Sequence, residues 1–221
     1  MLNIFRILGD LSHLASILIL IQTIQKTGSI DGISFKTQVL YALVFLTRYL
    51  DLLTFHWVSF YNTLMKIFFI CSSCYIVVLL QSYKKKNPVA YKEMVIADTF
   101  KIQYLLGGSL LMAFFFHHKF SLIEILWSFS VWLESCAILP QLFILSKSGK
   151  AQSLTVHYIF ALGLYRTLYV PNWIWRYYSE GRIDKLALIA GLVQTLVYSD
   201  FFYIYYKKVI KGFGAALPHY K

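Results

Sequence analysis

The sequence has few charged residues and few cysteines. Only 14% of its 221 residues are Asp, Glu, Lys or Arg, well below the ~25% of soluble domains, while 58% are hydrophobic. Three cysteines, Cys71, Cys74 and Cys136, all lie in apolar stretches, which makes a metal or redox role for them unexpected. No small-residue cleavage site follows the first apolar segment, so no cleavable signal peptide is expected. These shortages exclude a soluble globular fold and predict a polytopic membrane protein.

Seven apolar segments have the length of about 17–25 residues that crosses a bilayer core. They cover residues of about 4–24, 37–55, 58–81, 98–117, 120–145, 154–175 and 186–206. The longest connection is expected around 84–94, where Pro88 should stop a helix. The sequence therefore predicts an all-α membrane protein with seven transmembrane helices, forming a single domain over 1–221 with a short tail at 207–221.

The charges of the connections predict how the chain crosses the membrane. Most lysines fall on one side, whereas fewer basic residues, among them Arg6, Lys66 and Arg176, fall on the other. The lysine-rich side is expected in the cytosol, which places the N-terminus in the lumen or outside the cell and the C-terminus in the cytosol. The net charge of +11 comes mainly from these short connections, so nucleic-acid binding is not expected.

A weak internal repeat relates the two halves of the chain. Lys26-Thr27-Gly28 follows the first apolar segment and Lys147-Ser148-Gly149 follows the fifth, and an arginine, Arg48 or Arg166, lies in the segment after each motif. This pattern predicts a 3+1+3 parallel arrangement, with repeat 1 at about 4–81, a linker helix at 98–117 and repeat 2 at about 120–206. Pro140 is expected to kink the fifth helix.

Ionisable residues inside apolar segments are costly and usually face a polar cavity that carries function. Arg48 and Asp51 are three residues apart, so a continuous helix would put both on one face. The same argument groups Arg6, Asp10 and His13 in the first segment. The remaining candidates are polar and aromatic residues of the last three segments: Glu124, Trp127, Glu134, Tyr165, Arg166, Tyr169, Asn172, Trp173, Arg176, Gln194, Tyr198 and Asp200.

Several guanidinium groups on different segments repel one another unless anions join them, and arginine binds carboxylates two donors at a time. Glu124 beside Trp127 offers a carboxylate and an aromatic face, which suit a cation. The implied ligand is short, anionic at one end and cationic at the other, as an acidic peptide C-terminus would be. The alternative is that these groups form internal ion pairs, with Arg6 and Arg176 reaching the lipid headgroups.

Four blocks of sequence carry a resemblance to a known family. NIFRILGDLSHLASI (3–17), LTRYLDLL (46–53), FSLIEILWSFSVWLESCAILPQLFILSKSG (120–149) and LGLYRTLYVPNWIWRYYSEG (162–181) resemble the ER lumenal protein retention receptors, the KDEL/HDEL receptor family. The match runs over nearly the whole chain and departs mainly in 83–104 and after Lys211. That family is similar in architecture to the SWEET and PQ-loop transporters, in agreement with the repeat.

The resemblance implies roles for individual residues. By this resemblance, the ligand carboxylates are bound by Arg6, Arg48, Tyr49 and Arg176, and the ligand cation by Asp51, Glu124 and Trp127. The pocket is lined by Arg166, Tyr169 and Trp173, and the pH switch is formed by His13, Glu134 and Tyr165. Transport depends on Asn172 and Asp200, and coatomer is bound by Lys207, Lys208 and Lys211.

The implied function is a receptor in Golgi and ER membranes that binds a KDEL- or HDEL-like signal in the acidic Golgi and releases it at neutral pH. No enzyme activity, cofactor or metal is expected. The alternatives are a secondary transporter of a small solute, disfavoured by the many arginines, and a signalling receptor, disfavoured by the short cytosolic connections.

His13 is the predicted pH sensor, because the unperturbed pKa of histidine, about 6.5, lies between the pH values of the two compartments. Burial disfavours its protonated form and an incoming carboxylate favours it, so affinity should rise as the pH falls. Glu134 is the second titrating candidate. His117 and His118 are expected at a helix end, exposed to water.

Overall fold

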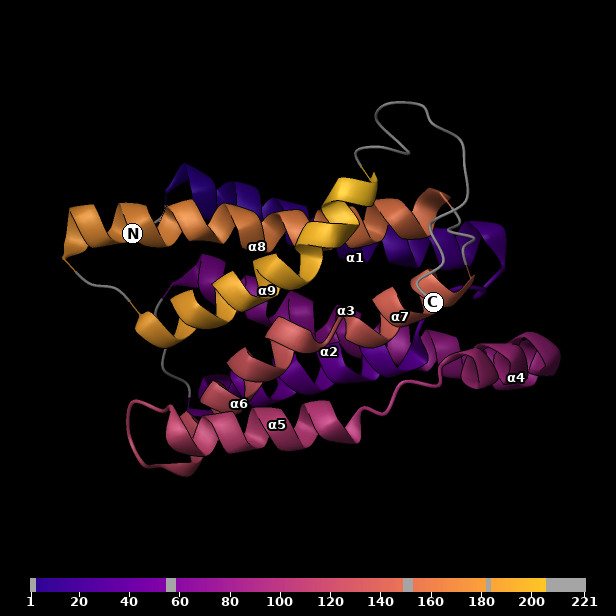
Figure 1. Cartoon of the computed structure of the whole chain (residues 1–221), viewed down its shortest axis with the longest axis horizontal. Coiled ribbons are helices and arrows are strands. Elements are labelled where there is room, and N and C mark those ends of the chain that lie inside the picture. Colours follow the sequence, from indigo (N-terminus) through magenta and orange to yellow (C-terminus); the bar gives the residue numbers. More distant parts are fainter. Residues whose placement is uncertain (1–2, 55–58, 149–152, 182–183, 206–221) are drawn as a thin grey trace. The chain divides into compact units, whose positions relative to one another are not determined.

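A computed structural model describes residues 3–54, 59–148, 153–181 and 184–205, and these ranges form helices without any strand (Figure 1). The predicted all-α class is therefore confirmed. The chain divides into two compact units. Unit 1 comprises Met1–Ile33 with Leu142–Lys221, and unit 2 comprises Ser34–Gln141.

Unit 1 is built on α1 (Ile4–Thr27), α8 (Ser153–Glu180) and α9 (Lys185–Tyr205), with α8 packed against both others (Figure 1). Asn3 begins α1, because its side chain accepts the Arg6 N–H at 2.9 Å. Gly28 ends α1 with φ of 62°, a left-handed conformation that favours glycine. The first copy of the repeated motif is thus a helix end. In the second copy Ser148 ends α7 (Leu139–Ser148), and Gly149 lies outside the described residues.

Three glycines let the helices of unit 1 approach closely. A Cβ atom on Gly9 of α1 would lie 2.8 Å from the Tyr169 ring, and one on Gly191 of α9 would lie 2.3 Å from the Trp173 ring. On α8 itself, a Cβ atom on Gly163 would lie 2.6 Å from the Tyr198 ring. Aromatic rings fill this space in each case, so these glycines set where the aromatic side chains of α8 and α9 lie.

Unit 2 contains α2 (Phe35–Arg48), the short 3-10 helix η1 (Leu50–Thr54), α3 (Phe60–Lys86), α4 (Pro88–Ala97), α5 (Gln103–Phe115) and α6 (Leu122–Cys136). The helix α2 packs on α3 and α6, α5 packs on α6, and α4 packs on α3. Unit 2 ends within α7.

Just before Pro140, where a kink is predicted, a two-residue turn at 137–138 separates α6 from α7. Proline has no N–H and its ring clashes with the carbonyl four residues earlier, here that of Cys136. Gln141, which follows Pro140, connects α7 to the start of α2: its N–H donates to Thr37 Oγ1 at 3.1 Å, and its Oε1 accepts the Ser34 N–H at 2.8 Å.

Three predicted segment boundaries were wrong. The segment 37–55 is not one helix, because α2 ends at Arg48 and a 3-10 turn follows, with the Leu52 N–H bonded to the Tyr49 carbonyl. The expected connection at 84–94 is helical, and Pro88 starts α4 instead of stopping a helix, since the first helical position needs no N–H. The segment 98–117 is helical only from Gln103 to Phe115.

Four helical stretches are long and apolar enough to cross a membrane: Ile4–Thr27, Phe60–Lys86, Leu122–Lys147 and Lys185–Tyr203. The apolar helix α5 is shorter. These stretches support the membrane assignment. The seven-span 3+1+3 arrangement stays a prediction.

Candidate functional site

In unit 1, Asp10 is the centre of a polar group between α1 and α8. The Tyr169 hydroxyl donates to Asp10 Oδ1, and Arg6 Nε lies 3.8 Å from Asp10 Oδ2, one helical turn away. Asp10 is buried, whereas the Arg6 side chain is 28% exposed. The pair therefore presents a partly accessible guanidinium, oriented by a buried carboxylate.

His13 lies one turn further along α1, and its ring stacks on Tyr165 with centroids 4.1 Å apart and planes 9° from parallel. Arg166 extends the group on α8: its guanidinium carbon lies 5.5 Å from the centre of the Tyr165 ring and 5.8 Å from that of Trp173. Such stacking stabilises cations over aromatic faces. Two members of the predicted pH switch, His13 and Tyr165, are thus in direct contact.

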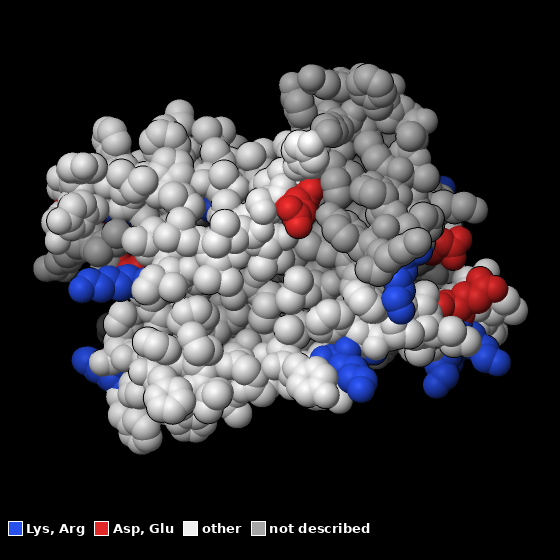
Figure 2. Space-filling view, viewed as in Figure 1, with Lys and Arg blue, Asp and Glu red and all other residues white. Residues whose placement is uncertain are grey.

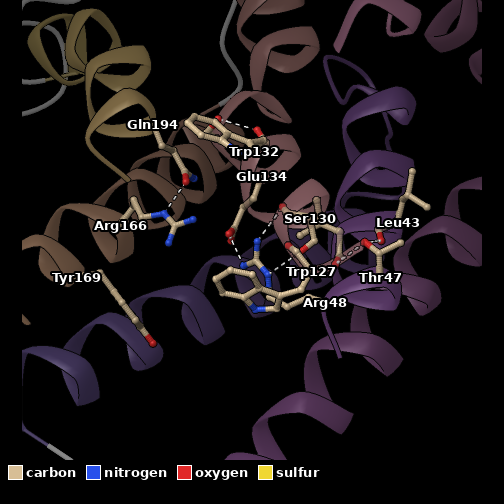
Figure 3. A network of polar contacts seen from close by, with 12 residues as sticks. Leu43, Thr47, Arg48, Trp127, Ser130, Trp132, Glu134, Arg166, Tyr169 and Gln194 are labelled. Atoms are coloured by element: carbon tan, nitrogen blue, oxygen red, sulfur yellow. Dashed lines mark hydrogen bonds and ion pairs between the residues drawn. The ribbon is translucent and has the colours of Figure 1, made fainter. Parts of the chain in front are cut away.

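Figure 3 shows the Arg166 side chain directed at Gln194 of α9, and its Nε donates to Gln194 Oε1 at 2.5 Å. Both residues are buried. Within the described part of the chain, the Gln194 amide nitrogen has no hydrogen-bond partner. It is therefore an orphan donor beside the predicted pocket arginine.

The remaining predicted residues of unit 1 differ in environment. Asn172 is buried and accepts a hydrogen bond at 2.8 Å from Asn3, so it fixes the start of α1 to α8. Arg176 forms an ion pair with Glu180 at 3.1 Å and remains 43% exposed. Asp200 is exposed on α9. Asn172 therefore has an architectural contact, and for Asp200 there is none among the residues that the structure describes.

In unit 2, Arg48 is held by α6 (Figure 3). It forms an ion pair with Glu134, while its Nε donates to Ser130 Oγ at 3.0 Å and its Nη2 to the Ser130 carbonyl at 2.8 Å. The Glu134 side chain is only 2% exposed. A guanidinium has five N–H donors, so these three contacts leave two for a further anion.

Asp51 does not share a helix face with Arg48, which corrects the prediction. It lies in η1 and pairs with Lys66 of α3, whose ammonium is 5.8 Å from the centre of the Tyr49 ring. The α-helix ends at Arg48, and the two residues pair with different helices, Arg48 with α6 and Asp51 with α3. Asp51 is therefore not an open cation site, since a ligand cation would have to compete with Lys66.

Glu124 and Trp127 lie in the first turns of α6, and both are partly exposed. Ser121 caps this helix by accepting the Glu124 N–H at 3.3 Å. Among the residues that the structure describes, the Glu124 carboxylate has no hydrogen-bond or ion-pair partner. The Trp127 ring lies 5.5 Å from that of His118, which is exposed as predicted. A carboxylate and an indole are thus available to a cation.

The structure brings the predicted residues together within each unit: Arg6, Asp10, His13, Tyr165, Arg166, Tyr169 and Trp173 in unit 1, and Arg48 with Glu134 in unit 2. That the arginines of both units converge on one ligand stays a prediction. Lys207, Lys208 and Lys211 lie outside the described residues.

The sequence reasoning missed Ser130 and Lys66 as partners of the predicted site residues. Ser130 lies four residues before Glu134, so helical spacing could have placed both on one face of α6. Lys66 gave no such signal, because its pairing with Asp51 depends on the fold.

A family model for the ER lumen protein retaining receptor matches residues 29–176. The chain is 72% identical over 218 residues to the ER lumen protein-retaining receptor of Saccharomyces cerevisiae, covering 98% of this chain and 100% of the relative. The identity is 65% over 219 residues with that of Kluyveromyces lactis, covering 99% and 100%. It is 51% over 221 residues with ER lumen protein-retaining receptor 2 of Gallus gallus, covering 98% and 100%.

Proposed function

Because the chain belongs to the ER lumen protein-retaining receptor family, we propose that it recognises escaped ER proteins by a C-terminal KDEL- or HDEL-like tetrapeptide and returns them from the Golgi to the ER. The family is one of receptors, not of enzymes. The observation that carries the proposal is the 72% identity over 98% of the chain to a protein of that name. This favours a receptor over a transporter of small solutes.

For the ligand carboxylates, the proposal assigns Arg6 and Arg176 in unit 1. Both guanidinium groups keep exposed surface while paired with a carboxylate one helical turn away, so each is oriented before a ligand arrives. The aromatic side chains Tyr169 and Trp173, with Arg166, line this part of the pocket in the proposal. Asn172 and Asp200 are proposed to be needed for transport.

In unit 2, the proposal assigns Arg48 and Tyr49 to the C-terminal carboxylate, using the two guanidinium donors that Glu134 and Ser130 leave. The first residue of the signal, Lys or His, is assigned to Glu124 and Trp127. Asp51 is kept in this group, with Lys66 as its competitor.

The pH dependence is proposed to arise from His13 and from Glu134, with Tyr165 as the stacking partner of His13. A ligand carboxylate on the two remaining Arg48 donors brings a second negative charge close to the buried Glu134, and a nearby like charge disfavours the ionised form of Glu134. Glu134 then gains by taking up a proton, as His13 does beside an incoming anion. Binding that takes up protons strengthens as the pH falls.

The proposal includes the seven-helix 3+1+3 topology, with the N-terminus in the lumen and the C-terminus in the cytosol. On the cytosolic side, Lys207, Lys208 and Lys211 would bind coatomer for return to the ER. Changing Lys207 and Lys208 to Ser should leave peptide binding intact and trap the protein in the Golgi, as measured by its distribution between the two compartments.

The test is peptide binding to purified variants. Arg48→Lys keeps the charge but loses the planar fork, so affinity should fall by ~1.5–3 kcal/mol. Glu124→Gln should weaken a Lys-first peptide much more than one with a neutral first residue, whereas Glu93→Gln, the same change at an exposed position of α4, should change neither. Wild-type affinity in Arg48→Lys, or equal losses for both peptides in Glu124→Gln, would overturn the assignments.

A further inference from the structure

The segment after α3 plays no part in the proposed receptor site, yet it has a defined structure. The helix α4 follows α3 directly, with Asn87 as its N-cap: the Asn87 side chain accepts the Ala90 N–H at 3.1 Å. Pro88 occupies the first helical position, where proline is preferred. The end of α3 and α4, residues 84–97, are therefore ordered as two successive helices joined at Asn87, and this junction is called the corner below.

One face of α4 packs against the rest of unit 2. Met94 is 4% exposed, and the Tyr91 ring lies edge-on to Phe35 with centroids 6.4 Å apart. The opposite face carries Val89 and Ile96, which are 67% and 63% exposed and lie seven residues apart, two helical turns. This helix thus presents large apolar side chains outward.

Lysines surround this apolar face. Lys84, Lys85 and Lys86 are exposed in the last turn of α3, and Lys92 lies exposed between Val89 and Ile96 on α4. Figure 2 shows basic side chains, with acidic ones beside them, around the position of α4 in Figure 1. Glu93 is the acidic residue between 84 and 97, so this segment is strongly basic.

The length of α3 places the corner at the membrane surface. Its 27 residues span roughly 40 Å, about 10 Å more than a hydrocarbon core. A bilayer crossed by α3, which is apolar and long enough to do so, would have the terminal lysines of this helix among its headgroups. Such a bilayer would lie beside α4.

We propose that α4 and the lysines at the end of α3 form a binding surface for anionic lipid headgroups, with Val89 and Ile96 inserted into the interfacial layer. Basic clusters next to a membrane span attract anionic lipid, and a helix with an apolar face and flanking lysines lies in the interface. A merely solvated charged face would not need two outward aliphatic side chains. A protein partner would need a surface that also accommodates the adjacent bilayer.

The experiment measures lipid retention by full-length detergent-solubilised protein, using native mass spectrometry with mixed phosphatidylserine and phosphatidylcholine. Wild type should retain phosphatidylserine preferentially, and less of it as salt rises. Changing Lys84, Lys85 and Lys86 to Ser should lower its affinity for phosphatidylserine at least tenfold, since each lysine near an anionic surface contributes roughly fivefold. The matched control changes Lys26, Lys101 and Lys147 to Ser, three exposed lysines elsewhere, and should retain it.

A second arm separates a lipid from a free phosphate. Replacing Val89 and Ile96 by Asn should weaken phosphatidylserine binding but leave inorganic phosphate binding unchanged. Melting temperatures monitor folding, and Lys92→Ser replaces the triple variant if that variant does not fold. Equal losses in both triple variants, or no loss in either, would overturn the proposal. The proposal would also be overturned if the variant with Lys84, Lys85 and Lys86 changed to Ser retained phosphatidylserine as the wild type does but no longer bound a protein partner of the wild type. That result would assign the corner to a protein partner.

Discussion

Replacing Gly191 by Ala tests whether the packing of α9 against α8 positions the proposed pocket. The new Cβ atom would lie 2.3 Å from Trp173, about 1 Å closer than ordinary van der Waals contact. Trp173 is buried against Tyr169, with ring centroids 5.9 Å apart, and near Arg166, so its ring has little room to move. Overpacking of this kind costs ~1–3 kcal/mol, of which the helix preference for Ala over Gly recovers ~0.5–1 kcal/mol.

The assay is thermal unfolding of purified protein, with peptide binding measured in parallel. A net loss of up to ~2.5 kcal/mol should lower the melting temperature by up to about 10 °C, and the displaced Trp173 ring should weaken peptide binding. The matched control is Gly108→Ala on α5, where a Cβ atom would meet nothing within 4 Å. This control should keep or raise the melting temperature and leave binding unchanged. Equal shifts in the two variants would refute the reasoning.

Three further predictions concern single side chains. Ser130→Ala removes the acceptor of the Arg48 Nε donor, so stability should fall by ~1–3 kcal/mol in a denaturation assay; an unchanged midpoint would remove Ser130 from the Arg48 site. Asp98→Ala loses a buried carboxylate that accepts from the Ser34 hydroxyl and the Lys36 N–H at the start of α2. It should lower the melting temperature, whereas Asp31→Ala, at an exposed position, should not. His13→Ala should lose most peptide binding at Golgi-like pH and flatten the pH profile; an unchanged profile would shift the switch to Glu134.

The sequence was sufficient for the helical class and for the kinds of residue in the candidate site. Long apolar segments predict membrane helices without knowledge of packing, because the bilayer requires every backbone polar group to be satisfied within the segment. Charged residues such as Arg48 and Glu134 stand out against that apolar background. Spacing along one helix also placed Arg6, Asp10 and His13 together correctly, because helical periodicity alone decides it.

Pairings between helices could not be predicted in this way. Arg48 and Asp51 have the spacing of one helical face, but their partners, Glu134 and Lys66, lie on different helices and the backbone leaves the α-helix between them. Gly191 carries no chemical signal in the sequence, since its role depends on a ring from α8. The helix α4 was mistaken for a connection because Pro88 is read as a stop when the cap before it is not recognised.

The measurement that tests the central claim most directly is binding of a labelled tetrapeptide, KDEL or HDEL, at acidic Golgi-like pH and at neutral pH. The peptide is compared with a free and with an amidated C-terminus. The account predicts tight binding of the free peptide at acidic pH, a loss of affinity of at most about tenfold per pH unit for each coupled proton as the pH rises, and little binding of the amidated peptide. Equal affinity for both peptides, or binding of the free peptide that does not change with pH, would contradict it.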